Sequence, residues 1–131
     1  MRKISYTLLV ENLVFGDQSS FTALNFAHAV IEEGHKLSKV FFYRRGVTHA
    51  NSFVFSEHDE LDLVKEWQRL ALTHDVRLET CLTASLRLGI LSIDGASARK
   101  ERGSNLARGF EPSSLMSLSE SLLTEKRVIQ F

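Results

Sequence analysis

The sequence predicts a single α/β domain over residues 1–131, with an open, mostly parallel sheet and helices on both faces. Strand-like segments alternate with segments of helical periodicity along the chain. The first strand, helix and strand fit into about forty residues, the length of a βαβ unit, which implies a parallel pair of strands. An apolar content of 44% in 131 residues suffices for one hydrophobic core.

The first part of the chain predicts a strand, a helix and a second strand. Residues 4–10 are rich in β-branched and aromatic side chains, as in a strand buried on both faces. The polar stretch that follows contains three suitable helix caps, namely Asp17, Ser19 and Ser20. Apolar side chains then recur at helical spacing over residues 21–33, and Gly34 stands at a C-cap position. Residues 37–43 predict the second strand.

The middle of the chain repeats this alternation. Ser56 with Asp59 resembles a capping box, and apolar residues recur at helical spacing over residues 61–71. Residues 76–80 predict a short third strand directly before the only cysteine of the chain. A short helix closed by Gly89 is expected next.

The last third is dominated by a polar, glycine-punctuated stretch over residues 92–109, which we expect to form the longest loop, with a helical turn near residues 96–101. Residues 113–126 place leucines on one helical face, and residues 127–131 predict a final strand.

The overall charge and the single cysteine exclude several classes of function. Sixteen basic residues balance sixteen acidic ones, so no global field attracts nucleic acid or a membrane surface. One cysteine excludes an intrachain disulfide and the multi-cysteine zinc and iron–sulfur sites, and we expect no cofactor. No apolar run reaches the roughly 18 residues of a membrane span, and the N-terminal apolar stretch lacks a cleavage site. We therefore expect a soluble, cytoplasmic protein with a reduced thiol.

Cys81 is expected where chemistry collects in parallel α/β sheets, beyond the carboxyl end of a strand and at the start of a helix. Free backbone N–H groups at a helix start favour a thiolate. A dithiol oxidoreductase is excluded because no second cysteine can resolve a disulfide. A carrier of persulfide sulfur needs only one accessible thiolate, which this inventory fits best. The alternative is that Cys81 fills space in the core.

Three residues after the second strand are expected at the same sheet edge as Cys81. His49 is the only one of the five histidines expected there, and a histidine base would be needed for protease-like nucleophilic catalysis. Arg44 and Arg45 either favour the thiolate or bind an acidic partner, and the alternative is a solvated pair.

Aromatic residues in loop-like segments predict a contact surface. Phe53, Phe55 and Phe110 fall outside the expected helices and strands. Large exposed apolar patches are uncommon on monomers, so we expect these rings to contact another protein chain. The alternative is that these rings fold back over the ends of the sheet.

Several stretches resemble the DsrE/TusD family of sulfur-relay proteins over nearly the whole chain, and within it most closely the TusD-like sulfurtransferase subunits. The stretches that carry the resemblance are "FAHAVIEEGHKLSKVFFYRRGV" (26–47), "AN" (50–51), "DELDLVKEWQRL" (59–70), "CLTASLRLGI" (81–90), "SNLARGF" (104–110) and "RVIQF" (127–131).

The resemblance implies that Cys81 carries sulfane sulfur as a persulfide, with Asn51 as a supporting or partner-contact residue. It further implies a heterohexamer with TusB-like and TusC-like subunits, two copies of each. A TusA-like protein would donate the sulfur and a TusE-like protein would accept it, serving 2-thiolation of the wobble uridine of tRNA without stable direct binding of nucleic acid.

Two loops depart from the family pattern. Glu11 and Asn12 stand where the family usually has Gly-Pro, and Thr48 and His49 stand where it has an aromatic residue followed by Asn. Three alternatives remain at this point: a DsrE-like carrier in sulfur oxidation, a non-catalytic assembly subunit and a flavodoxin-like nucleotide binder. The cysteine argues against the second, and the single glycine without a P-loop lysine in residues 14–20 argues against the third.

Overall fold

The structure, a computed structural model, describes residues 2–98, 103–125 and 127–131. Its elements in chain order are β1 (Ser5–Val10), α1 (Gln18–Glu32), β2 (Lys36–Phe42), the 3-10 helix η1 (Arg44–Ala50), α2 (Leu63–His74), β3 (Arg77–Cys81), α3 (Leu82–Arg87), α4 (Ile93–Ala98), β4 (Phe110–Ser113), α5 (Leu115–Thr124) and β5 (Arg127–Gln130).

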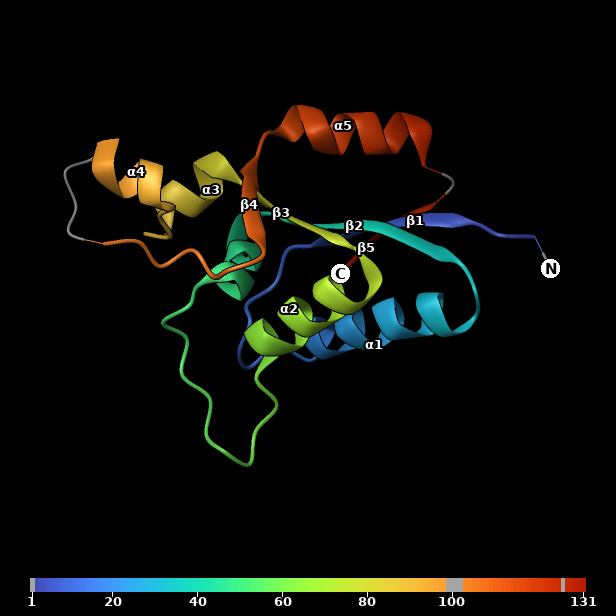
Figure 1. Cartoon of the computed structure of the whole chain (residues 1–131), viewed down its shortest axis with the longest axis horizontal. Helices are drawn as coiled ribbons and strands as arrows, with labels where there is room; N and C mark the ends of the chain where they lie inside the picture. The colour runs from blue at the N-terminus through green and yellow to red at the C-terminus, as the bar shows by residue number, and fades with distance from the viewer. Residues whose placement is uncertain (1, 99–102, 126) are drawn as a thin grey trace.

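The five described strands form one sheet in the order β4-β3-β2-β1-β5. Each pairs parallel to its neighbours, so all five carboxyl ends meet at one edge. Helices α1 and α2 lie against one face of the sheet and α5 lies over the other (Figure 1). The predicted parallel sheet with helices on both faces is therefore confirmed.

The larger hydrophobic core lies between the sheet and the α1/α2 layer. Trp67 of α2 is fully buried and meets Phe42 of β2 edge-on, with ring centroids 5.5 Å apart. Phe42 also packs against Phe110 of β4 at 5.4 Å. Burying rings of this size removes on the order of 150–250 Å² each from water, so this layer contributes most of the hydrophobic stabilisation.

The opposite face of the sheet has a much smaller apolar cluster beneath α5. Its buried members are Phe41, Cys81 and Leu118. Helix α5 otherwise presents serines to the sheet and leaves Met116 and Leu123 70% and 87% exposed. Helix α5 is thus apolar on its outer side.

Local capping explains where α1 begins and ends. The Asp17 carboxylate accepts a 2.9 Å hydrogen bond from the Ser19 backbone N–H, so Asp17 is the N-cap among the three predicted candidates. Gly34 follows the helix with φ +81°, a conformation that glycine adopts without steric cost.

Helix α2 begins later than the sequence predicted. Ser56 and Asp59 do not form a capping box at its start; they lie in the loop before the helix. Asp62 is the N-cap, and its carboxylate accepts a 3.1 Å hydrogen bond from the Lys65 backbone N–H. Leu61, expected on the apolar stripe, is 42% exposed. The helix therefore begins where its buried side chains begin, and the adjacent Asp62 caps it in place of Ser56 and Asp59.

A strand that the sequence did not predict follows directly after the predicted loop of residues 92–109. Residues 110–113 form β4, which pairs with β3 through the Leu78–Phe110 register. The expectation that Phe110 is a loop aromatic was therefore wrong, because the ring is 6% exposed and packs in the core. The expected helical turn corresponds to α4, and residues 99–101 of that prediction lie outside the described part of the chain.

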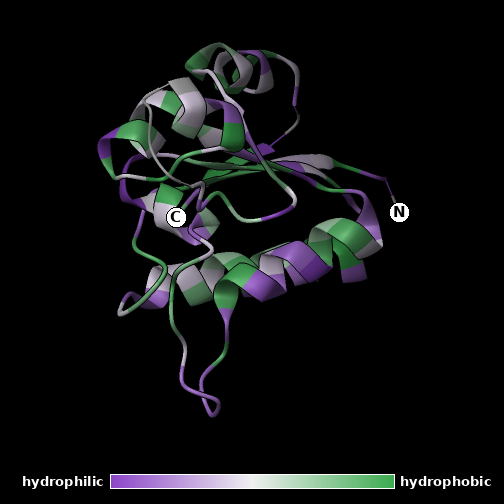
Figure 2. Ribbon diagram, turned by 60° about the vertical axis from the view of Figure 1, so that its left-hand side comes forward, coloured by the Kyte–Doolittle hydropathy of each residue, from purple (hydrophilic) through white to green (hydrophobic). Residues whose placement is uncertain are grey.

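A long loop projects from the surface. Residues 51–62 form this loop (Figure 1), which has apolar stretches along its length and a hydrophilic tip (Figure 2).

Among the helices that the structure describes, none is both long and apolar enough to cross a bilayer.

Candidate active site around Cys81

Cys81 is the last residue of β3 and the N-cap of α3, as the sequence predicted for its position. Its backbone is extended (φ −63°, ψ 119°), which turns the chain from the sheet into the helix. Because the neighbouring strands are parallel, the segments that follow β2 and β4 reach the same edge.

The thiol is more buried than a carrier residue was expected to be. Cys81 is 3% exposed and packs against Phe41 and Leu118. Two clefts nevertheless meet at it, one of about 500 Å³ towards η1 and one of about 410 Å³ towards β4. Thr83 and Leu115 line both clefts. Both clefts reach Cys81, so they are openings through which another molecule can approach it.

Three arginines surround the larger cleft. Arg44 and Arg45 of η1 and Arg87 of α3 line it together with Cys81, and no acidic residue among those that the structure describes lines either cleft. Arg44 and Arg45 were predicted from the sequence, and Arg87 was not. Arg87 could have been predicted from its four-residue spacing to Thr83, because that spacing places both side chains on one face of the short helix that follows Cys81.

Arg44 is held at the rim of the cleft by two neighbours. It lies 3.7 Å from a carboxylate oxygen of Glu11, and its guanidinium carbon lies 5.6 Å from the centre of the Tyr43 ring. Its φ of 53° is left-handed, which is uncommon for a residue other than glycine and lets η1 begin directly after β2. The atypical Glu11 thus contacts both this arginine and Gln130 of β5.

Gly46 lets η1 pack closely against the end of β1. A Cβ atom at this position would lie 1.9 Å from the carbonyl oxygen of Val10, far inside van der Waals contact. No larger residue fits without displacing the backbone, so glycine is required for the approach that brings the arginines to the cleft.

His49 lies at the expected sheet edge, but its side chain lies on the α1/α2 face, away from Cys81. The ring is fully buried and stacks 5.3 Å from Phe42. Trp67 donates a 3.0 Å hydrogen bond from Nε1 to His49 Nδ1, so the ring proton resides on Nε2. Nε2 in turn lies 3.2 Å from the Asn12 carbonyl oxygen and 3.1 Å from Ser20 Oγ. His49 is a neutral core residue, and the atypical Asn12 loop is anchored to it.

Burial holds the pKa of His49 at about 4, although the Asn12 carbonyl and Asp17 partly oppose that effect. The unfolded chain therefore binds a proton between pH 6.5 and 4 that the folded chain does not. We expect the free energy of unfolding to fall by about 3 kcal/mol as the pH drops through this window. Urea titrations at a series of pH values measure this slope.

The matched variants for that measurement are His49→Gln and His74→Gln, the second at an exposed position on α2. The slope should shrink in His49→Gln and persist in His74→Gln. Equal slopes in the two variants would assign the pH dependence to other groups.

Asn51 joins η1 to the segment before β4. Its Oδ1 accepts hydrogen bonds from the Phe53 backbone N–H at 2.9 Å and from Asn105 Nδ2 at 3.2 Å. Asn105 also accepts a 2.7 Å bond from the Leu91 backbone N–H and donates a 3.0 Å bond to the Gly89 carbonyl. Asn105, which was not predicted from the sequence, therefore ties the segment after α3 to the end of η1.

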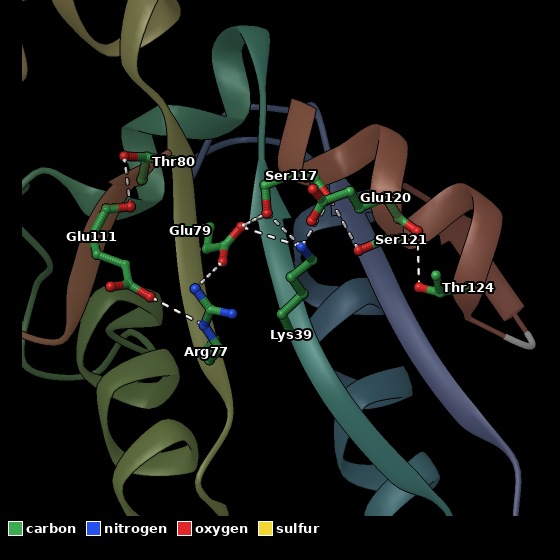
Figure 3. A network of polar contacts seen from close by, with 9 residues as sticks. All are labelled: Lys39, Arg77, Glu79, Thr80, Glu111, Ser117, Glu120, Ser121 and Thr124. Atoms are coloured by element: carbon green, nitrogen blue, oxygen red, sulfur yellow. Dashed lines mark hydrogen bonds and ion pairs between the residues drawn. The ribbon is translucent and has the colours of Figure 1, made fainter. Parts of the chain in front are cut away.

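A polar network lies under α5 on the same face as Cys81 (Figure 3). Lys39 Nζ lies 3.4 Å from Glu79 Oε1 and donates a 2.6 Å hydrogen bond to Ser117 Oγ, which donates at 2.6 Å to Glu79. Arg77 pairs with the other carboxylate oxygen at 2.8 Å. Burial alone would raise the pKa of Glu79, but the Ser117 hydroxyl and the two cations outweigh it and lower the pKa.

This network fixes the N-terminal half of α5 over Cys81. Glu79 lies two residues before the cysteine on the same strand, so both side chains project from one face of the sheet. Ser117 and Leu118 are adjacent on α5, and Leu118 covers the sulfur. The cover over the thiol therefore depends on a buried charge pair.

The arrangement suits transfer of a group to sulfur better than acid–base catalysis. Among the described side chains, none forms a hydrogen bond with Cys81, and His49 lies on the other face of the sheet. Three arginines line the larger cleft together with Cys81. A protease-like dyad has no support in this geometry.

Comparison with known proteins gives consistent results. Residues 5–131 match the model of the DsrE/DsrF-like family. A protein named "Sulfurtransferase TusD homolog" from Vibrio parahaemolyticus is 50% identical over 131 residues, covering 100% of both chains. "Sulfurtransferase TusD" from Pectobacterium carotovorum is 46% identical over 128 residues, covering 98% of this chain and 99% of its own.

The crystal structure of the ychN protein from E. coli shares the fold. It superposes with a TM-score of 0.75 at 19% identity, covering 100% of both chains. With the family match spanning nearly the whole sequence and full-length relatives at about half identity, the chain belongs to the DsrE/DsrF-like family.

Proposed function

We propose that the chain is a sulfurtransferase subunit of a protein sulfur relay, in which Cys81 carries sulfane sulfur as a persulfide. The observation that carries this proposal is the only cysteine of the chain lying at the base of a cleft lined by three arginines. The names of the full-length relatives support the activity.

The transfer step needs no oxidant. The Cys81 thiolate attacks the outer sulfur of a donor persulfide, a new sulfur–sulfur bond forms on Cys81, and the donor cysteine leaves as a thiolate with the electron pair. The arginines stabilise the anionic persulfide, and Phe41 and Leu118 shield it from water. With no second cysteine in the chain, the sulfur stays on Cys81 until an acceptor thiolate attacks it.

The relay that we propose has a TusA-like donor and a TusE-like acceptor, and it serves 2-thiolation of the tRNA wobble uridine in the cytoplasm. A reducing compartment keeps the thiol free between turnovers. The formal net charge of zero supports delivery of sulfur through proteins and not through direct contact with tRNA.

Intact-mass spectrometry tests the carrier role. The protein is incubated with cysteamine persulfide or with a persulfide-loaded TusA-like protein, and its mass is measured before and after treatment with a reductant. We expect a gain of one sulfur atom on Cys81 that the reductant removes. An unchanged mass under excess of both donors would refute the carrier role.

We also propose assembly with TusB-like and TusC-like subunits as a heterohexamer, two copies of each. Phe53 and Phe55 are each 75% exposed on the long loop, and Phe15 is 67% exposed beside it. Phe15 also lines a cleft of about 560 Å³ with Val54 and Leu61. An exposed aromatic cluster of this kind is typical of an interface core.

Size-exclusion chromatography with light scattering checks the assembly. We expect the chain to elute with co-expressed TusB-like and TusC-like subunits, and a Phe53→Ser/Phe55→Ser variant to elute separately from them. Leu72→Ser, at a leucine of α2 that is 89% exposed, serves as the control. A wild-type chain that stays monomeric beside these subunits would contradict the assembly.

A further inference from the structure

We infer that the surface around Cys81 docks an acidic, apolar segment of a partner protein that carries the cysteine exchanging sulfur with Cys81. This inference rests on the proposed function and names the chemistry of its partner. The surface, called here the Cys81 face, consists of three arginines and three leucines, namely Arg44, Arg45, Arg87, Leu82, Leu88 and Leu115.

The charge of the Cys81 face is left largely uncompensated by the chain itself. Within the described ranges, neither Arg45 nor Arg87 forms an ion pair, and Arg44 reaches only Glu11, at 3.7 Å. Asp17 interacts with Arg45 without forming an ion pair: hydrogen bonds from Ser19 lower the pKa of Asp17 most, and the charge of Arg45 lowers it further. A partner that places carboxylates here gains attraction without displacing an internal pair, which speeds encounter and selects orientation.

The exposed leucines of the Cys81 face indicate that its ligand is a protein segment and not a small anion. Leu82, Leu88 and Leu115 are 46%, 48% and 45% exposed around the two clefts. A sulfur oxyanion would occupy the cationic cleft and leave these side chains in water, whereas a protein segment with its own apolar residues would cover them.

The depth of the thiol sets the shape of that segment. Cys81 is 3% exposed, so a cysteine on a flat protein surface cannot reach its sulfur. The partner cysteine must protrude, entering one of the clefts that meet at Thr83 and Leu115. Charge, apolar surface and depth together select a protruding cysteine flanked by acidic and apolar residues.

Two synthetic peptides of equal length test the inference. Each carries one cysteine persulfide, flanked in one peptide by Asp, Glu and Leu and in the other by Lys and Leu. Single-turnover transfer of sulfur to Cys81 is followed by intact mass at low and high salt. We expect the acidic peptide to react about tenfold faster at low salt, and the difference to vanish near 1 M salt, where the Debye length is about 3 Å.

Matched variants locate the effect. Arg45→Glu and Arg87→Glu should abolish or invert the preference, and Leu115→Ser should slow both peptides. Arg69→Glu makes the same charge change on α2, where the side chain is 69% exposed on the opposite face of the sheet. The preference should be unchanged in this control.

Three results would overturn the inference. They are equal rates for the two peptides, a preference that survives Arg45→Glu and Arg87→Glu, or loading by thiosulfate as fast as by the acidic peptide. In the last case thiolate attack on the sulfane sulfur releases sulfite, and the cleft is a small-anion site. Loading by cysteamine persulfide separates these results from failure of the proposed function, because that donor carries no acidic or apolar flank. If it too leaves Cys81 unmodified, the carrier role fails and the inference falls with it.

Discussion

Replacing Cys81 with alanine is expected to abolish sulfur transfer and leave a folded protein. The variant has no thiol, and with a single cysteine in the chain nothing can substitute for it. Because Cys81 is 3% exposed between Phe41 and Leu118, removing the sulfur leaves a small cavity, and we expect a loss of about 1 kcal/mol in the free energy of unfolding. Transfer is measured by intact mass with a persulfide donor, and stability by urea denaturation.

Cys81→Ser separates the role of the sulfur from that of packing. Its hydroxyl is close in size to the thiol, but the buried site offers it apolar neighbours, so we expect a loss of about 1–3 kcal/mol. Both variants should be inactive although their stabilities differ. Detectable transfer by either variant would show that Cys81 is not the carrier.

Replacing Glu79 with glutamine is expected to destabilise the protein by about 3 kcal/mol, because the change leaves Lys39 buried without a counter-charge. The Ser117 hydroxyl would still link the two side chains, but among the residues that the structure describes no carboxylate would remain in an ion pair with Lys39 to offset desolvation of the ammonium group. Urea denaturation at neutral pH measures the loss.

A double variant shows whether the charge pair or the space it fills matters. Lys39→Met/Glu79→Leu replaces both charges with apolar groups of similar length, and it should be much closer to wild type than Glu79→Gln alone. The pair of Glu66 and Arg69, 2.8 Å apart on α2 with the arginine side chain 69% exposed, provides a control in which Glu66→Gln should cost less than about 1 kcal/mol. If Glu79→Gln costs no more than Glu66→Gln, the network does not hold α5 in place.

The pH dependence of this network follows from the direction of its pKa shift. The pKa of Glu79 is lowered in the folded protein, so its contribution to stability is present above the ordinary glutamate pKa of 4.5 and is lost as the pH falls through the folded value. His49 acts at higher pH, between 6.5 and about 4. The two effects therefore appear as successive losses during acid titration.

The sequence by itself was enough to place the main elements and the position of Cys81. Strand composition and helical periodicity are local properties, so they identified β1, α1, β2, β3 and α5 without knowledge of the contacts. The βαβ spacing implied parallel strands, and parallel strands put Cys81 and η1 at one edge. The family resemblance rested on the same local stretches, and the family match confirmed it.

Local sequence patterns did not predict where α2 begins, because two capping patterns compete there, and they did not predict β4, because this strand is very short. Helix α2 begins at Leu63 and not near Ser56, because that is where buried side chains begin and Asp62 can cap them. Strand β4 has four residues and includes Pro112, so its composition reads as a loop. It becomes a strand only because β3 offers it a parallel edge, which is a long-range contact.

Only the tertiary structure determines on which face of the sheet each site residue lies and how deeply its side chain is buried. His49 and Cys81 share a sheet edge, yet the fully buried hydrogen bond with Trp67 holds the histidine on one face while α5 covers the cysteine on the other. Arg87 lines the cleft, and Asn105 joins the segment after α3 to the end of η1, through contacts between segments far apart in the chain. Local periodicity specifies which residues can share a face of one element, but only the packing of several elements determines which faces meet and how deeply a side chain is buried between them.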